Sequence, residues 1–184
     1  MDVDRIFLTG FMGAGKSTVG KLLADKIGYR FYDVDRMLVK GFGKTVSRIF
    51  NENGEHAFRK AETQVLQELC KRSCVMISTG GGTLARPENM DMALAHGTVI
   101  YLFAPVEELY ERVIFSPKDR PILEEPDTEG VFREKFAARE ATYKRAHLSF
   151  GVSGKQPANV VDDVLAVLAP LLSASSTRQE AGSS

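Results

Sequence analysis

The chain has 184 residues, with 24 basic and 24 acidic side chains and therefore no formal net charge at pH 7. This length suits one domain with a proper core, and 43% hydrophobic with 26% charged residues is typical of a globular protein. The balanced charge argues against a nucleic-acid or membrane partner. No apolar run approaches the ~18–20 residues that cross a bilayer. The first residues are acidic, where a secretory signal would be basic.

The two cysteines, Cys70 and Cys74, are spaced neither as a CxxC motif nor as zinc ligands. We therefore expect two reduced structural thiols. A cytoplasmic location is the default that follows from this and from the acidic N-terminus.

Short apolar runs alternate with amphipathic stretches along the chain. The predicted strands are Arg5–Thr9, Phe31–Asp33, Cys74–Ser78, Thr98–Phe103 and Leu148–Val152. Helices are predicted at Lys16–Ile27, from Glu55 towards Arg72, from Pro87, from near Pro105, around Phe132–Tyr143, and from Val160 to an end near Pro170. Five strands separated by helices predict an α/β fold, with a parallel sheet covered on both faces.

Two segments lack this periodicity. Ser116–Thr128 holds three prolines and several charges, which is typical of a mobile loop or lid, and we place the lid at about residues 112–128. Residues 173–184 are rich in Ser, Ala and Gly and are predicted to form a disordered tail. The remainder, residues 1–172, has no linker or repeat and is predicted to be one domain.

The strongest motif is Gly10–Ser17, which fits GxxxxGK[ST] between a predicted strand and a predicted helix. Its glycines let backbone N–H groups face a phosphate, and the following helix adds the positive end of its dipole. Lys16 is expected to bridge the β- and γ-phosphates, and Ser17 to bind Mg²⁺. The predicted ATP contacts here are Gly13, Ala14, Gly15, Lys16, Ser17 and Thr18. GTPases, motor-type ATPases and small-molecule kinases share this loop, so it leaves the phosphoryl acceptor open.

Asp33 and Asp35 end the second predicted strand. A side-chain period of two places both carboxylates on one face, towards the cleft if Val34 packs inward. One could orient Mg²⁺-bound water while the other accepts a proton from an attacking hydroxyl. Carboxylate pairs are also common at the surface ends of strands, so this motif alone leaves both interpretations open.

Basic residues and a glycine run complete the candidate set. Arg59 could clamp a carboxylate or pair with Glu55 or Glu62 on a solvated helix face, and spacing alone favours the second. The run Gly80–Gly82 follows a strand directly, which favours close approach of a ligand to the backbone over a plain turn. Arg120 in the lid could reach a transferring phosphoryl group, or be one charge in a solvated loop.

Taken in order, six segments resemble shikimate kinase: FMGAGKST, FYDVD, GEHAFRKAE, STGGGT, DRPIL and an ARxxxY that precedes the last strand. The resemblance covers Ile6–Leu168, and the set DVD, FRKAE and TGGG is specific to that family among kinases with this loop. It implies a three-layer P-loop kinase fold with a five-stranded parallel sheet and a mobile lid. The implied reaction is ATP-dependent phosphorylation of the 3-hydroxyl of shikimate, in aromatic amino-acid biosynthesis, with Mg²⁺ as cofactor.

The resemblance also assigns roles. Shikimate is bound by Asp35, Arg59, Gly80, Gly81, Gly82 and Arg139, with the arginines on its carboxylate and Asp35 on the reactive hydroxyl. Lys16, Asp35 and Arg120 are the catalytic set, and Ser17 and Asp33 are on the magnesium side. The family's adenine-stacking arginine is replaced here by Val113, with Arg112 one position earlier, so either the loop is one residue longer and Arg112 makes the adenine contact, or the contact is lost. Gln156 resembles a residue of the family's second adenine-contacting loop. The expected partners are ATP or ADP and shikimate, bound by a monomer.

Three alternatives compete with this interpretation. A gluconate-type kinase would share the scaffold, but the DVD, FRKAE and TGGG set favours shikimate. A non-catalytic nucleotide-binding module would be expected to lack Lys16, Asp35, Arg59 or Arg120, and the chain has all four. A nucleoside monophosphate kinase would need several arginines for a second phosphate-bearing nucleotide, and they do not occur in the right places.

Overall fold

The computed structural model describes residues 2–116 and 128–181, with side chains described as far as residue 173. The strands are β1 (Arg5–Thr9), β2 (Arg30–Asp33), β3 (Val75–Ser78), β4 (Thr98–Phe103) and β5 (Leu148–Gly151). The helices are α1 (Lys16–Ile27), α2 (Val34–Phe42), α3 (Val46–Cys70), α4 (Pro87–His96), α5 (Val106–Ile114), α6 (Thr128–Tyr143) and α7 (Pro157–Ala181).

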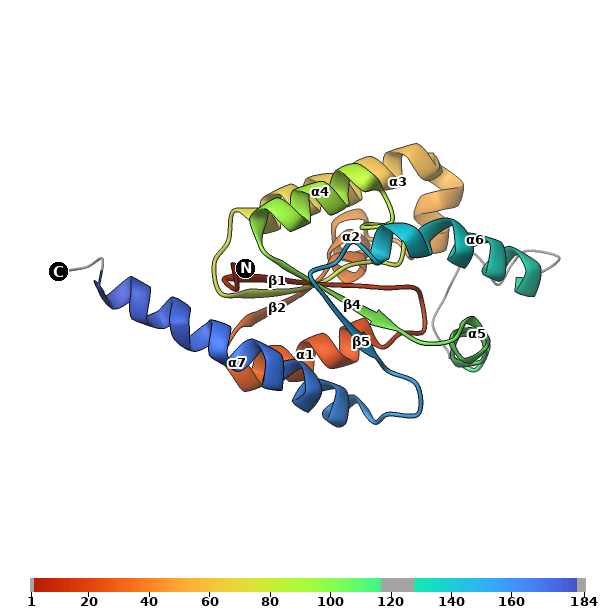
Figure 1. Ribbon diagram of the computed structural model, residues 1–184. Coiled ribbons are helices and arrows are strands. Elements are labelled where there is room, and N and C mark those ends of the chain that lie inside the picture. The colour runs from red at the N-terminus through yellow and green to blue at the C-terminus, as the bar shows by residue number, and fades with distance from the viewer. Residues whose placement is uncertain (1, 117–127, 182–184) are drawn as a thin grey trace.

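The five strands form one parallel sheet in the order β2-β3-β1-β4-β5, which confirms the predicted fold class. Helices α1 and α7 cover one face, and α3 and α4 cover the other (Figure 1). The central strand β1 is buried on both sides because its side chains alternate between two cores. Ile6 and Leu8 pack in the core on one side, and Phe7 packs in the core on the other.

Helix α1 has the bounds that the sequence predicts, and glycines set both of its ends. Gly15 precedes it with φ 81°, and Gly28 follows it with φ 73° and donates its N–H to the carbonyl of Ala24. Both backbone conformations lie in the left-handed region that glycine adopts without a Cβ clash. The N-terminus of α1 therefore lies at the end of β1, where its dipole and backbone N–H groups favour a bound phosphate.

Helix α2 was not predicted. The chain was expected to stay extended through Asp35, but it becomes helical at Val34, and the Asp33 side chain caps the new helix by accepting from the Arg36 N–H at 3.1 Å. The argument that a strand period of two places Asp33 and Asp35 on one face is therefore wrong. Asp33 is an N-cap and Asp35 lies in the first helical turn, where a carboxylate also complements the helix dipole.

Helix α3 begins at Val46, nine residues before the predicted start at Glu55. Thr45 caps it, and a break at Gly54, with φ 80° and ψ 158°, separates a first segment from the segment that the sequence predicts. A glycine tolerates that conformation, so the chain turns there and continues as a helix. The break places Phe50 and Phe58 close together, with their ring centroids 4.5 Å apart.

Helix α7 continues past Pro170 to Ala181, so the predicted end at Pro170 is wrong and the backbone of residues 173–181 is helical rather than irregular. Proline costs a helix about 3 kcal/mol because it removes one hydrogen bond and crowds the preceding turn. The flanking Ala and Leu residues have high helix propensity, which offsets part of this cost.

The predicted lid lies between α5 and α6. Its first residue, Arg112, is part of α5, which ends at Ile114, and α6 begins at Thr128. Residues 117–127, including Arg120, lie outside the described residues.

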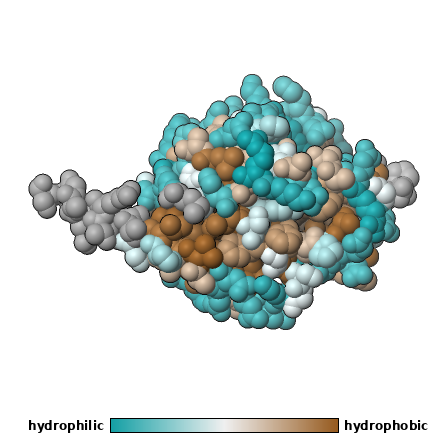
Figure 2. All heavy atoms as spheres, viewed as in Figure 1, coloured by the Kyte–Doolittle hydropathy of each residue, from teal (hydrophilic) through white to brown (hydrophobic). Residues whose placement is uncertain are grey.

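The surface is mostly hydrophilic in Figure 2, with hydrophobic side chains gathered beside α7 and the edge strand β5. The exposed apolar residues include Val167 on α7 and Phe103 at the end of β4. In the part of the chain that the structure describes, no helix combines the length and the hydropathy of a membrane span.

Candidate active site

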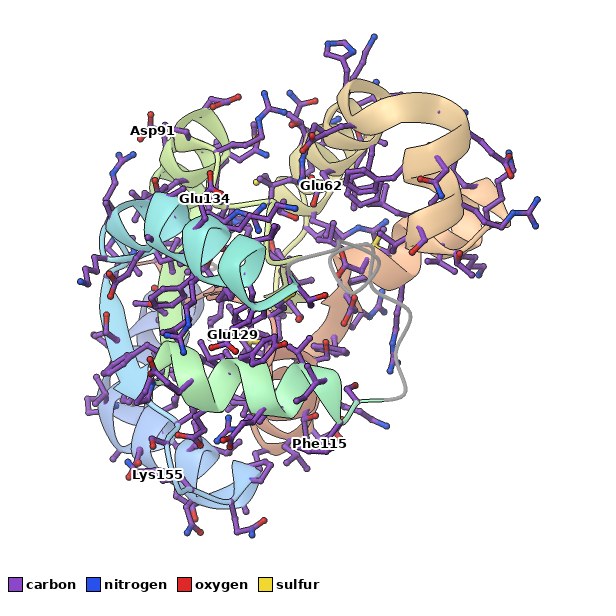
Figure 3. All side chains as sticks on the ribbon, turned by 90° about the vertical axis from the view of Figure 1, so that its right-hand side faces the viewer. Glu62, Asp91, Phe115, Glu129, Glu134 and Lys155 are labelled. Carbon is purple, nitrogen blue, oxygen red and sulfur yellow. The ribbon has the colours of Figure 1, made fainter. Side chains whose placement is uncertain are left out.

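A cavity of about 1150 Å³ lies beyond the carboxyl ends of the central strands. Figure 3 looks onto this side of the molecule, with Glu62 on the inner side of α3 and Asp91 and Lys155 at the periphery. Its walls come from the loop after β1, from α2 and α3, from the turn after β3, and from α5 and α6. Cationic side chains outnumber carboxylates in its lining: Lys16, Arg36, Lys40, Arg59, Arg112, Lys135 and Arg139 against Asp33, Asp35, Glu55 and Glu62. Such a cavity favours anionic ligands.

One side of the cavity is the phosphate loop, Gly10–Ser17. Gly10, Gly13 and Gly15 have φ values of 137°, 87° and 81°, and a Cβ on Gly13 would lie 2.7 Å from the carbonyl oxygen of Leu109. The loop therefore requires glycine at these positions, both for its curvature and for its close approach to α5. The Lys16 ammonium lies across the loop and donates to the carbonyls of Gly10 at 2.8 Å and of Phe11 at 3.0 Å.

Ser17 and Asp33 lie side by side where the loop meets α2. The Ser17 hydroxyl donates to Oδ2 of Asp33 at 2.6 Å, and the Ser78 hydroxyl is 3.5 Å from that of Ser17. The described residues hold no cluster of three or more His, Cys, Asp and Glu side chains suited to a metal. One hydroxyl and one carboxylate nevertheless fit Mg²⁺, which keeps several waters and uses few protein ligands beside substrate phosphates.

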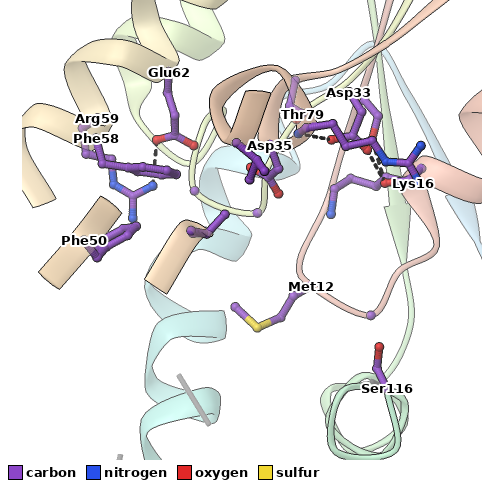
Figure 4. A pocket seen from close by; sticks show the side chains of 18 of the residues that line it. Met12, Lys16, Asp33, Asp35, Phe50, Phe58, Arg59, Glu62, Thr79 and Ser116 are labelled. Atoms are coloured by element: carbon purple, nitrogen blue, oxygen red, sulfur yellow. Dashed lines mark hydrogen bonds and ion pairs between the residues drawn. The ribbon is translucent and has the colours of Figure 1, made fainter. Parts of the chain in front are cut away.

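The Asp35 carboxylate lies in the cavity between two groups of side chains, with Glu62 and Arg59 on one side and Lys16 and Asp33 on the other (Figure 4). The pKa of Asp35 is raised from 3.8 to about 6, chiefly by burial and also by the negative charges of Asp33 and Glu62, against the opposing charges of Lys16 and Arg59. A carboxylate with this pKa is mostly ionised at neutral pH, yet basic enough to accept a proton from a hydroxyl.

Arg59 lies opposite the phosphate loop, on α3. Its guanidinium donates to Oε1 of Glu55 at 3.1 Å and to Oε2 of Glu62 at 2.7 Å, and lies 5.4 Å and 5.5 Å from the ring centroids of Phe50 and Phe58. Both predicted carboxylate partners are therefore present. Glu55 is exposed to solvent, but the Arg59 side chain is only 18% exposed and that of Glu62 only 1%, so the Arg59–Glu62 pair does not lie on a solvated face. Glu62 and the two rings hold the guanidinium against the cavity.

The glycine run, Gly80–Gly82, forms the turn after β3. Gly81 and Gly82 line the cavity, whereas Gly80 is buried behind it. The Gly81 carbonyl accepts a hydrogen bond from the buried hydroxyl of Tyr143, and a longer one, at 3.4 Å, from Arg139. We call Asp35, Arg59, Gly81, Gly82 and Arg139 the acceptor wall, since the fold brings them together on the side of the cavity that faces the phosphate loop.

Of the two predicted adenine contacts, Arg112 lies at the cavity and Gln156 does not. Arg112 lines the cavity, but its guanidinium donates to the carbonyls of Gly13 at 3.4 Å and of Val152 at 3.0 Å, and it pairs with Glu108. It thereby connects the phosphate loop to the segment after β5. Gln156 is exposed and lies outside the cavity lining; its carbonyl accepts from the first turn of α7. Ala14, a member of the phosphate loop, is buried and lies outside the cavity lining.

Several functional contacts were not predicted. Phe50 flanks Arg59, and Tyr143 holds Gly81, although the ARxxxY motif had marked that tyrosine. Glu62 was considered only as a surface partner, but it is buried and also accepts from the Thr83 hydroxyl at 2.6 Å. A carboxylate three residues after an arginine on a buried helix face is the one signal that could have indicated this role.

Comparison with known proteins identifies the family. The model of the family described as shikimate kinase matches residues 12–169 of the chain. A shikimate kinase of Persephonella marina is 41% identical over 161 residues, which is 88% of this chain and 96% of that protein. The solved shikimate kinase of Acinetobacter baumannii, in complex with shikimate, superposes with a TM-score of 0.86 at 33% identity and covers 91% of this chain and 94% of that one.

A gluconokinase of Sinorhizobium meliloti also superposes, with a TM-score of 0.64 over 97% of this chain and 99% of that one. At 17% identity this likeness concerns the fold alone. The matched segment, by contrast, contains the phosphate loop from Met12 and the entire acceptor wall. The chain belongs to the shikimate kinase family.

Proposed function

We propose that this chain transfers the γ-phosphoryl group of ATP to the 3-hydroxyl of shikimate, giving shikimate 3-phosphate and ADP on the route to the aromatic amino acids. The observation that carries the proposal is the position of Asp35. Its carboxylate lies in the cavity between Lys16 of the phosphate loop and Arg59 of the acceptor wall, with a pKa raised to about 6. A base at this point can receive the proton of a hydroxyl that attacks a phosphate held by the loop.

The donor is held by the phosphate loop. Backbone N–H groups from Gly13 to Thr18 and the N-terminus of α1 surround the β-phosphate, and Lys16 exchanges its bonds to loop carbonyls for bonds to phosphate oxygens. Ser17 and Asp33 would hold Mg²⁺ through oxygen atoms that now share a hydrogen bond. When bound, the ion would neutralise negative charge on the phosphate groups.

The acceptor is held by the acceptor wall. Arg59 and Arg139 bind its carboxylate, as their planar forks suit a carboxylate oxygen pair, and Gly81 offers backbone without a side chain in the way. Asp35 takes the proton from the 3-hydroxyl while that oxygen bonds to the γ-phosphorus. The bond from this phosphorus to the bridging β-phosphate oxygen breaks, and ADP leaves with the electron pair.

The remaining assignments are also proposals. Arg120 is proposed to contact the transferring phosphoryl group, and Arg112 and Gln156 the adenine, although Arg112 is turned towards the phosphate loop and Gln156 lies outside the cavity lining. We further propose a monomer that acts in the cytoplasm and binds neither nucleic acid nor a membrane.

A coupled ADP-release assay with shikimate, gluconate and AMP in parallel tests this function. We expect turnover that depends on shikimate and on Mg²⁺, and none above background with the other two. Turnover on gluconate or AMP would select a rival kinase, and ATP binding without any turnover would select a non-catalytic module. The matched control is Lys135→Ala, a cavity cation outside both proposed binding sets, which is expected to keep shikimate dependence.

A further inference from the structure

The glycine run has no backbone reason to consist of glycine. The phosphate-loop glycines Gly10, Gly13 and Gly15 all have positive φ, a conformation that other residues rarely adopt. None of the three residues of Gly80–Gly82 has it, although all are described. Positive φ therefore does not explain these glycines, and the space around them is the reason that the contacts point to.

The space beside two of these glycines is filled by side chains of the acceptor wall. A Cβ built on Gly80 would lie closer than 3.0 Å to Oδ1 of Asp35, and one on Gly82 closer than 3.0 Å to the guanidinium of Arg59. Heavy atoms do not approach a real Cβ so closely. Alanine at either position would compete for the volume that the functional side chain now occupies.

Gly81 differs from its two neighbours. The nearest atom to a Cβ built on Gly81 is the Met12 backbone nitrogen at 3.4 Å, close to ordinary van der Waals contact, and Gly81 lines the open cavity. The run therefore divides into two kinds of position: Gly81 leaves room for a ligand, and the outer two leave room for the protein's own side chains.

We propose that Gly80 and Gly82 are positioning residues: the missing side chain of Gly80 leaves room for the Asp35 carboxylate, and that of Gly82 leaves room for the Arg59 guanidinium. The proposal deepens the proposed function and rests on it, because it gives these two side chains their working positions. Under this proposal Gly81 contacts shikimate directly, whereas Gly80 and Gly82 do not.

The physical consequence is an effect on activity without a matching effect on folding. Each crowded atom belongs to the end of a side chain, so the chain can relieve an added methyl group by moving that end and leaving the backbone in place. Arg59 would then lose its bond to the buried Glu62 or its position at the cavity, and Asp35 would move away from the reacting hydroxyl. Misplacement by about 1 Å costs about 100-fold in rate.

Single variants give the first measurement. Gly80→Ala is expected to lower kcat about 100-fold with the KM for ATP unchanged. Gly82→Ala is expected to raise the shikimate dissociation constant about tenfold, with ATP binding unchanged, because a charged hydrogen bond is weakened. The matched control is Gly41→Ala on α2, the helix of Asp35, where a Cβ would meet nothing within 4 Å. That variant is expected to keep wild-type kinetics.

Double-mutant cycles test whether each glycine acts through its partner. In an Arg59→Ala background, Gly82→Ala is expected to change the shikimate dissociation constant less than twofold, and in an Asp35→Ala background Gly80→Ala is expected to leave kcat unchanged. Additive effects would overturn the proposal, since they would mean that the glycines contact shikimate directly or support the fold. If Arg59→Ala fails to fold because Glu62 loses its partner, Arg59→Gln, which is shorter but can still donate to Glu62, takes its place.

This outcome is distinguishable from failure of the proposed function. Wild-type protein that shows no shikimate-dependent ADP release refutes the function and leaves the glycine proposal without its basis. Wild-type protein that turns over shikimate while the cycles are additive refutes only the positioning roles. Thermal unfolding of Gly80→Ala, Gly82→Ala and Gly41→Ala, expected within a few degrees of the wild type, excludes a general loss of structure.

Discussion

The phosphate loop is one continuous run of eight residues, whereas the acceptor wall takes Asp35 from α2, Arg59 from α3, Gly81 and Gly82 from the turn after β3, and Arg139 from α6. The phosphate loop works mainly through backbone N–H groups and positive-φ glycines. The acceptor wall works through side chains that other residues hold in place, as Glu62 holds Arg59. A site built from backbone is encoded locally, but one built from side chains depends on the whole fold.

The largest expected effect that separates the two sides is that of Asp35→Asn. The amide keeps the shape of the carboxylate but cannot accept the proton, so kcat should fall by about 10²–10⁴-fold while the KM for ATP changes little. Steady-state kinetics with each substrate varied in turn measures this. An equal loss of ATP affinity would place Asp35 on the donor side and contradict its assignment to the acceptor wall.

Arg59→Lys comes next. Lysine keeps the positive charge but lacks the planar fork that binds a carboxylate through two hydrogen bonds, so the KM for shikimate should rise about 10–100-fold. The KM for ATP should stay the same. The control is Arg48→Lys, an exposed arginine of α3 that pairs with Glu52 away from the cavity lining, and it should change neither constant.

The pH profile gives a third, smaller effect. The pKa of Asp35 is raised from 3.8 to about 6, and its ionised form is the base, so kcat/KM should fall about tenfold between pH 7 and pH 5. The same titration has the opposite effect on stability. The folded protein binds the Asp35 proton more tightly than the unfolded chain does, so this proton stabilises the fold at low pH. The stabilisation is lost as pH rises from about 4 to about 6. In Asp35→Asn the acid limb should disappear from the residual rate.

The smallest expected effect concerns the donor side. Arg112→Ala removes hydrogen bonds to the Gly13 and Val152 carbonyls and should raise the KM for ATP a few-fold, about 1 kcal/mol, with the KM for shikimate unchanged. Arg133→Ala on α6 removes two exposed ion pairs, to Glu107 and Glu129, outside the cavity lining and serves as the control. A larger rise in the KM for shikimate would mean that this arginine belongs to both sides.

These contrasts explain what the sequence could and could not predict. All five strands and the bounds of α1 followed from apolar runs and glycine punctuation. Helix α2 was missed because it starts immediately after β2 and is short, so local pattern could not separate the two. Pro170 was taken as a helix end, since a proline is the strongest local signal for one, but tertiary context and neighbouring helix formers prevail there.

The candidate site divides in the same way. The phosphate loop could be found from spacing alone, whereas Asp35 and Arg59 were ambiguous from spacing, and family resemblance assigned roles to them and to Arg139. The burial of Glu62 and its bond to Arg59 could not be predicted, because spacing alone does not reveal which face of α3 is covered. The same holds for Gly80 and Gly82: the sequence marks them as unusual, but only coordinates identify the side chains that use their space.

Asp33 has a consequence for how mutations at this site will be classified. One of its carboxylate oxygens accepts from Ser17 at the start of α1, and the other caps α2, the helix that carries Asp35. The same group thus belongs to the nucleotide's helix and to the helix of the proton acceptor. A mutational scan that sorts residues by which substrate's KM they alter will find that Asp33 variants alter both. Asp33 therefore cannot be assigned to only one of the two binding sites.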